Sequence, residues 1–280
     1  MRKISYNTIV EHTQKLCLDA NYLLGKDVIR ALTRACEHEV SAPGKRVLEH
    51  LIQNAEIAMK GEYPLCQDTG FAVFIIELGQ EITIQGGLLK DAINEGVRRA
   101  YKLGYLRNSI VRDPLDRVNT GDNTPAVIWT DLVDGDTLTI HMAPKGGGSE
   151  NMSKIAMLTP AVGEQGVIDY IVGEVDKAGG NPCPPIIVGV GIGGTFEKVA
   201  WLAKKSILRP LGEPHPTPYY ADLERRLLQR INDLGIGPMG FGGRTTALAV
   251  HIEVYPCHIA SLPVALNIQC HSARHKSITL

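Results

Sequence analysis

The sequence predicts an α/β fold with mixed sheets and interleaved helices, in a single large domain over residues 1–280. Stretches in which apolar residues recur at helical spacing alternate with short apolar runs that are typical of strands. We find no internal repeat, and helices and strands stay interleaved along the chain, which favours one α/β domain over two independent ones. Within this domain we expect a helical part over residues 1–60 and an α/β part over residues 61–280.

The amino-terminal part is expected to be helical. Apolar residues fall on one helical face over 9–23, again over 28–35 and again over 47–58. Ser41 to Gly44 interrupt this pattern. We therefore expect helices on both sides of a break at 41–44.

The middle of the chain is expected to form a mixed sheet. Asp134 and Gly135 join two alternating apolar segments, which predicts a β-hairpin. Gly79 marks a turn between two shorter segments. The predicted elements are strands at 71–78, 81–84, 126–132 and 137–143 and a helix at 88–103.

The carboxy-terminal half continues the alternation. Gly179 and Gly180 follow a helical stretch, at the position where a left-handed helix cap favours glycine. The proline-rich segment 209–218 is the best candidate for an excursion, and a glycine-rich loop ends at Gly243. The predicted elements are helices at 164–178, at 195–208 and up to about 234, and strands at 185–190, 245–255 and 262–268.

Composition excludes several classes of partner. Lysine and arginine total 29 against 30 acidic residues, a net charge of −1, so we expect no nucleic-acid or anionic-membrane partner. No apolar run approaches the roughly 18 residues of a membrane span, and the amino terminus has no export signal. We expect a cytoplasmic protein in which cysteines are thiols or metal ligands rather than disulfides.

Three of the six cysteines lie in loops. Cys66 is in PLCQDTG, Cys183 in GGNPCPP and Cys270 in NIQCHSARH. An iron-sulfur cluster takes thiolates from separated loops, and three thiolates would leave one iron free to act as a Lewis acid. Three scattered loop thiols remain an equal alternative on spacing alone. Cys17 and Cys36 are expected to pack within helices, and Cys257 is ambiguous.

Glycine-rich stretches suggest two further kinds of site. Gly189, Gly191 and Gly194 satisfy GxGxxG, which would suit an NAD-dependent dehydrogenase, but no strand with a terminal acidic residue follows at the required distance. NTGDNTPA from Asn119 and KGGGSENMSK from Lys145 expose amides that suit a small dicarboxylate. Structural turns are the simpler reading for NTGDNTPA. Arg107 could clamp a carboxylate, although a surface role is commoner.

Five motifs in this order, PLCQDTG, NTGDNTPA, KGGGSENMS, GVGIGGT and NIQCHSARH, resemble the alpha subunits of class I iron-sulfur fumarases and L-tartrate dehydratases. The resemblance implies a 4Fe-4S cluster with one open iron and reversible hydration of fumarate to malate. The alternative is the dehydration of tartrate to oxaloacetate. A separate beta subunit, a small dicarboxylate substrate and an alpha–alpha dimer are the implied partners.

The resemblance also implies roles for individual residues. Cys66, Cys183 and Cys270 match the cluster ligands, and Gln67 and Asp68 match residues that touch substrate. Arg107, with Arg112 as the fallback, matches a substrate arginine, and Gly148 would offer a backbone N–H. His258 matches a histidine that pairs with Asp68, an arrangement suited to proton transfer; a core histidine is the alternative from sequence alone. His271 and His275 flank the last ligand and would contact the cluster or line the loop.

Overall fold

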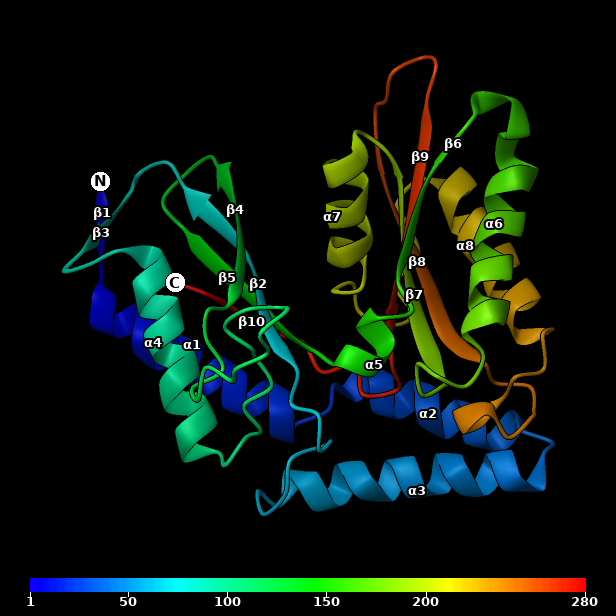
Figure 1. Ribbon diagram of the computed structural model, residues 1–280, viewed down its shortest axis with the longest axis horizontal. Coiled ribbons are helices and arrows are strands. Elements are labelled where there is room, and N and C mark those ends of the chain that lie inside the picture. The colour runs from blue at the N-terminus through cyan, green and yellow to red at the C-terminus, as the bar shows by residue number, and fades with distance from the viewer. The chain divides into compact units, whose positions relative to one another are not determined.

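The computed structural model describes residues 1–280, and the chain divides into two compact units (Figure 1). Unit 1 comprises residues 1–25, 55–147 and 274–280, and unit 2 comprises residues 26–54 and 148–273. Both units combine helices with a mixed sheet, so the predicted α/β class is confirmed. The assignment of residues 1–280 to one domain stays a prediction.

Unit 1 is built around a four-stranded sheet of order β10-β5-β2-β4. In this sheet β2 is parallel to β4 and antiparallel to β5, while β1 and β3 form a separate parallel pair. Helices α1 and α4 pack on each other and contribute to the same hydrophobic core as the sheet. The elements are β1 (Arg2–Ser5), α1 (Tyr6–Tyr22), β2 (Phe71–Gly79), β3 (Ile82–Gln85), α4 (Leu89–Leu103), β4 (Val127–Val133), β5 (Leu138–Lys145) and β10 (Lys276–Thr279).

The predicted hairpin between 126–132 and 137–143 is wrong. Both strands form, as β4 and β5, but they lie on either side of β2 and do not pair with each other. The centre of β2 is a run of buried apolar residues, Ala72 to Ile76, which is typical of a strand covered on both faces. Burial of this strand therefore decides the pairing, and the Asp134-Gly135 turn only reverses the chain.

The helices predicted in the amino-terminal sixty residues are confirmed. They are α1, α2 (Lys26–His38) and α3 (Ala42–Met59), and α3 runs from unit 2 into unit 1. Ser5 caps α1, because its side chain accepts a hydrogen bond from the Thr8 N–H at 3.0 Å. The break lies at 39–41, earlier than predicted. Pro43 and Gly44 fall in the first turn of α3, where the missing N–H of proline is tolerated.

Unit 2 is a four-stranded sheet of order β6-β9-β7-β8, in which β7 is parallel to β8 and antiparallel to β9. Helices α6 and α8 cover one face and α7 covers the other (Figure 1). The elements besides α2 and α3 are α5 (Gly147–Glu150), which begins at the last residue of unit 1, β6 (Lys154–Leu158), α6 (Gly163–Ala178), β7 (Ile186–Gly193), α7 (Phe196–Ser206), α8 (Pro218–Asn232), β8 (Ala247–Tyr255) and β9 (Leu262–Gln269), with short 3₁₀ turns at Pro160–Val162 and Pro238–Gly240.

Most predicted elements of this half are confirmed, including the helix cap at Gly179, which has a φ of 53°. Segment 209–218 contains no helix or strand before α8, as expected of an excursion. The sequence did not predict β1, β6, β10 or α5, which are each four or five residues long. None of the helices has the length and apolar character needed to cross a membrane.

Candidate functional site

Asp68 in unit 1 has its carboxylate fixed by two backbone amides. One oxygen accepts the Gly70 N–H at 3.0 Å, and the other accepts the Gly147 N–H at 2.8 Å. Gly70 has a φ of +76°, and a Cβ there would lie 2.8 Å from backbone atoms of Lys145, so this tight turn requires glycine. The half-buried carboxylate thus lies where the PLCQDTG loop meets the glycines that follow β5.

Three buried side chains hold the loop that carries Asp68, and the sequence analysis assigned none of them. The Tyr101 hydroxyl donates to the carbonyls of Thr69 and Gly70 at 2.8 and 3.1 Å. Asn123 donates to the Gly70 carbonyl at 3.1 Å, and Arg274 donates to the Asp68 carbonyl. Asn123 lies within NTGDNTPA and Arg274 within NIQCHSARH, so membership of these motifs was the sequence signal that could have identified them.

Arg107 lies beside the Asp68 loop through its backbone. Its carbonyl accepts the Thr69 hydroxyl at 3.0 Å, while its side chain is exposed. The fallback residue, Arg112, is exposed in a turn that its own N–H closes onto the Val118 carbonyl at 2.7 Å. Gln67 is exposed and its side-chain oxygen lies 3.3 Å from the Cys66 thiol. Unit 1 therefore gathers Cys66, Gln67, Asp68 and the backbone of Arg107.

Unit 2 brings the loops of Cys183 and Cys270 together. The backbone N–H of His271 donates to the Cys183 carbonyl at 3.3 Å, and its Nδ1 lies 3.2 Å from the same oxygen. A Cβ on Gly148 would lie 3.8 Å from the Asn181 carbonyl, so the glycine loop is also near Cys183. Of the flanking histidines, His271 thus joins the two cysteine loops.

The state of the thiols fits cluster binding. Cys66 and Cys270 are half-buried and Cys183 is exposed, all in irregular loops. The side-chain amide of Gln269 lies 3.8 Å from the Cys270 sulfur, the kind of donor that tunes a metal-bound thiolate. In contrast, Cys17 is fully buried in α1, and burial raises the pKa of its thiol. Neither unit by itself gathers three Cys, His, Asp or Glu side chains for a metal ion; unit 1 has one predicted ligand and unit 2 has two.

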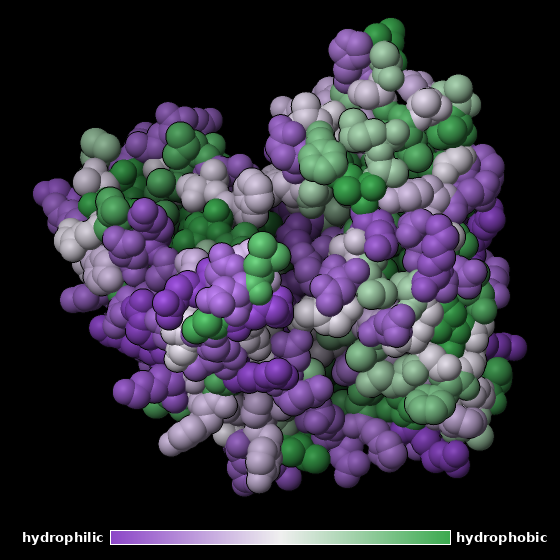
Figure 2. All heavy atoms as spheres, in the orientation of Figure 1, coloured by the Kyte–Doolittle hydropathy of each residue, from purple (hydrophilic) through white to green (hydrophobic).

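The structure does not place His258 near the cysteines of unit 2. His258 is exposed in the loop between β8 and β9, whose tip carries both hydrophobic and hydrophilic side chains (Figure 2). Cys270 follows the far end of β9, and this strand of eight residues spans roughly 26 Å. Asp68 lies in unit 1 and His258 in unit 2, so the expected Asp68–His258 couple stays a prediction. His258 is not the core histidine of the alternative reading.

The glycines of the GxGxxG stretch do not form a dinucleotide site. Gly189 and Gly191 lie inside β7, whereas the fingerprint requires a loop between strand and helix. A Cβ at these positions would lie 2.4 Å from the Ala203 carbonyl and 2.2 Å from the Val199 carbonyl of α7. These two glycines therefore allow α7 to pack closely on the sheet, and the dehydrogenase alternative loses its structural basis.

A polar network behind the glycine loop joins α5, α7 and β9. Lys204 donates to the Glu150 carboxylate, and Asn267 donates to Glu150 at 3.0 Å and to Ser153 at 2.9 Å. Burial lowers the pKa of Lys204, and the neighbouring Glu150 opposes this shift. The network anchors the segment after Gly148 to β9, the strand that Cys270 follows.

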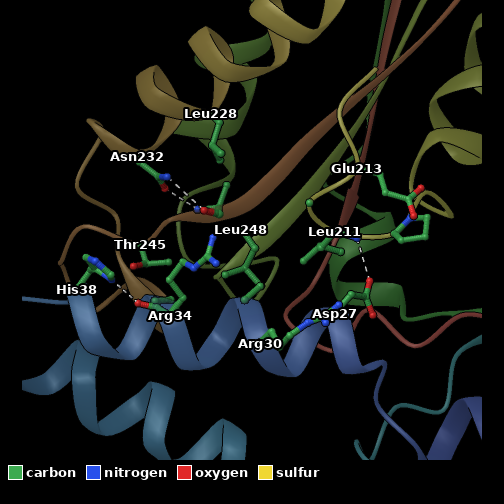
Figure 3. Close-up of a pocket in the computed structure, with 15 residues that line it drawn as sticks. Asp27, Arg30, Arg34, His38, Leu211, Glu213, Leu228, Asn232, Thr245 and Leu248 are labelled. Carbon is green, nitrogen blue, oxygen red and sulfur yellow. Dashed lines mark hydrogen bonds between the residues drawn. The ribbon is translucent and has the colours of Figure 1, made fainter. Parts of the chain in front are cut away.

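A separate pocket of about 800 Å³ lies between α2 and the loop after α7 (Figure 3). The Asp27 carboxylate accepts the Leu211 N–H at 2.9 Å and ties the two walls together. Arg34 extends from α2 toward Thr245 and Leu248 (Figure 3). None of the predicted site residues lines this pocket, so it is not part of the candidate site.

Comparison with known proteins agrees with the motifs. A family model described as fumarate hydratase (Fumerase) matches residues 10–279. A Methanocaldococcus jannaschii protein provisionally named L(+)-tartrate dehydratase subunit alpha is 43% identical over 267 residues, 93% of each chain. The L(+)-tartrate dehydratase subunit alpha of an Escherichia coli strain is 36% identical over 259 residues, 90% of this chain and 84% of that protein.

Proposed function

Because the chain belongs to the fumarate hydratase family, we propose that it is the alpha subunit of a two-subunit hydro-lyase that interconverts fumarate and malate. The observation that carries the proposal is Asp68, whose carboxylate is held by two amides in a loop that also contains Cys66. We include a beta subunit in the proposal because the relatives are named as alpha subunits.

We propose that Cys66, Cys183 and Cys270 together hold a 4Fe-4S cluster. Their half-buried or exposed thiols and irregular loops support this, as does the Gln269 amide beside Cys270. Of the four points where the chain passes from one unit to the other, Gly147–Gly148 and Ala273–Arg274 fall within the proposed motifs. When bound, such a cluster supplies a Lewis-acidic iron without a protein thiolate.

The residues of this chain then bind and orient the substrate and exchange a proton with it. Asp68, fixed in orientation by Gly70 and Gly147, exchanges a proton with the water that adds or the hydroxyl that leaves. Arg107 binds one substrate carboxylate, since a guanidinium matches a carboxylate with two parallel hydrogen bonds. Gln67 and the Gly148 N–H contact the remaining substrate oxygens.

L-Tartrate is the second candidate substrate, because the relatives at 43% and 36% identity are named for it. The test is to produce the chain with its beta subunit without oxygen and to compare kcat/KM for fumarate, malate and L-tartrate. The proposal predicts that fumarate and malate are interconverted faster than tartrate is dehydrated. Turnover of tartrate alone would replace fumarate by tartrate, and turnover of none would contradict the hydro-lyase assignment.

A further inference from the structure

Arg274 is a buried cation that no carboxylate neutralises. The residue is 2% exposed, and no Asp or Glu oxygen lies within 4.0 Å of its guanidinium. In unit 2 the half-buried Arg209 is instead paired with the buried Glu224 at 2.8 Å. A charge removed from water without a counter-charge is strongly unfavourable, so an anion is expected near Arg274 in the working protein.

The contacts of Arg274 lead to the segment that contains Cys66. Its Nη2 donates to the Asp68 carbonyl, and its Nη1 donates to the Asn21 side-chain oxygen at 3.2 Å. The Asn21 carbonyl in turn accepts the Leu65 N–H at 2.8 Å. Arg274 and Asn21 thus hold both ends of residues 65–68. The third nitrogen of the guanidinium, Nε, is buried and its N–H has no hydrogen-bond partner.

We propose that Arg274 is a positioning residue that also supplies the fixed counter-charge for the anionic centre at Cys66. A 4Fe-4S cluster with three thiolates has a net negative charge, which is what a buried guanidinium requires. The Asp68 carbonyl and the Asn21 side-chain oxygen accept hydrogen bonds from Nη2 and Nη1, but these neutral groups do not neutralise the charge. This inference rests on the cluster in the proposed function.

The test compares three variants of the full chain, reconstituted with iron and sulfide without oxygen. Arg274→Gln removes the charge, Arg274→Lys keeps it but loses the planar fork, and Arg46→Gln changes an exposed arginine of α3 as a control. The measurements are iron and acid-labile sulfide per chain and the reduction potential of the cluster, followed by electron paramagnetic resonance.

We expect a more negative reduction potential in Arg274→Gln, because reduction adds a negative charge that is no longer compensated. Arg274→Lys should stay close to the unmodified chain, and Arg46→Gln should match it. An unchanged potential in Arg274→Gln with full iron content would overturn the proposal, as would an Arg274→Lys variant that falls as far as Arg274→Gln.

If Arg274→Gln does not fold or does not hold iron, the Arg274→Lys variant tests the charge role. Wild-type iron content and potential in Arg274→Lys would support the charge role, while loss of iron there as well would contradict it. An unmodified chain without iron would overturn the proposed cluster, and this inference with it. If the unmodified chain holds iron, a negative result with the Arg274 variants contradicts only the role of Arg274.

Discussion

The groups that hold Asp68 are backbone N–H groups, which a side-chain substitution does not remove. The carboxylate of Asp68 itself is therefore the group to test. Asp68→Asn keeps the shape but removes the group that exchanges the proton, and we expect kcat to fall by at least ~100-fold. Iron content should be unchanged, because Asp68 is not a proposed ligand. The measurement is turnover of the assembled enzyme beside Asp116→Asn, which changes an exposed aspartate of the same unit. Retained turnover would remove Asp68 from the proton path.

Arg107 and Arg112 offer a direct comparison of two exposed arginines in one loop region. Only Arg107 is hydrogen-bonded through its backbone to Thr69, the neighbour of Asp68. Loss of charge-assisted hydrogen bonds to a substrate carboxylate should raise KM by roughly tenfold or more in Arg107→Gln. Arg112→Gln should change KM little. The reverse ranking would assign the substrate carboxylate to Arg112.

Helix α5 and helix α7 are joined by Lys204 and Glu150, whose network reaches Asn267 in β9. Lys204→Met should release the segment after Gly148 and lower kcat/KM by roughly tenfold. This size is typical for residues that hold the groups of a site in place without touching the substrate. Lys177→Met is the matched control, because it breaks the pair between the exposed Lys177 and Glu174 on α6. Lys204→Arg should recover part of the activity. Equal effects of Lys204→Met and Lys177→Met would contradict the anchoring role.

The junction of α2 and α3 is fixed by the carboxylate of Glu39, which is 7% exposed. It accepts the N–H groups of Val40, Ser41, Arg244 and Thr245 at 2.9 to 3.0 Å. Burial alone would raise the pKa of Glu39, but these amide hydrogen bonds outweigh it and the net pKa lies below its usual range.

A lowered pKa in the folded state sets the sign of the pH dependence. The stabilisation by Glu39 is complete above the pKa of the unfolded chain, about 4.3, and is lost as pH falls through the lower folded pKa. Glu39→Gln should reduce the free energy of unfolding by about 2 kcal/mol at pH 7, and the difference should shrink in acid. Urea unfolding at several pH values measures it, with the exposed Glu37→Gln as control. A pH-independent difference would contradict the account.

At the scale of the whole molecule, strong local patterns predicted the elements but not all of their pairing. The buried runs of β2 and β7 and the helices α4 and α6 follow from periodicity and glycine caps. The pairing of β4 with β2 depends on which strand is buried on both faces, and the sequence of a local turn does not determine that burial. Strands β1, β6 and β10 are too short to show a period and form only on a partner strand.

The candidate site was predictable only as separate motifs. Loop chemistry singled out Cys66, Cys183 and Cys270, and the resemblance added Asp68. The hydrogen bond from Gly147 to Asp68 joins residues 79 positions apart, and the burial of Arg274 depends on tertiary packing. The position of His258 likewise follows from the strand order of unit 2, which the motif spacing does not contain.

The three-cysteine cluster is the central claim, and iron and acid-labile sulfide per chain test it most directly. The chain should be reconstituted without oxygen beside Cys183→Ser and beside Cys257→Ser, which changes another exposed thiol that is not a proposed ligand. The account predicts about four iron and about four sulfide in the unmodified chain and in Cys257→Ser, with a sharp loss in Cys183→Ser. No iron in the unmodified chain, or equal iron in both variants, would contradict it.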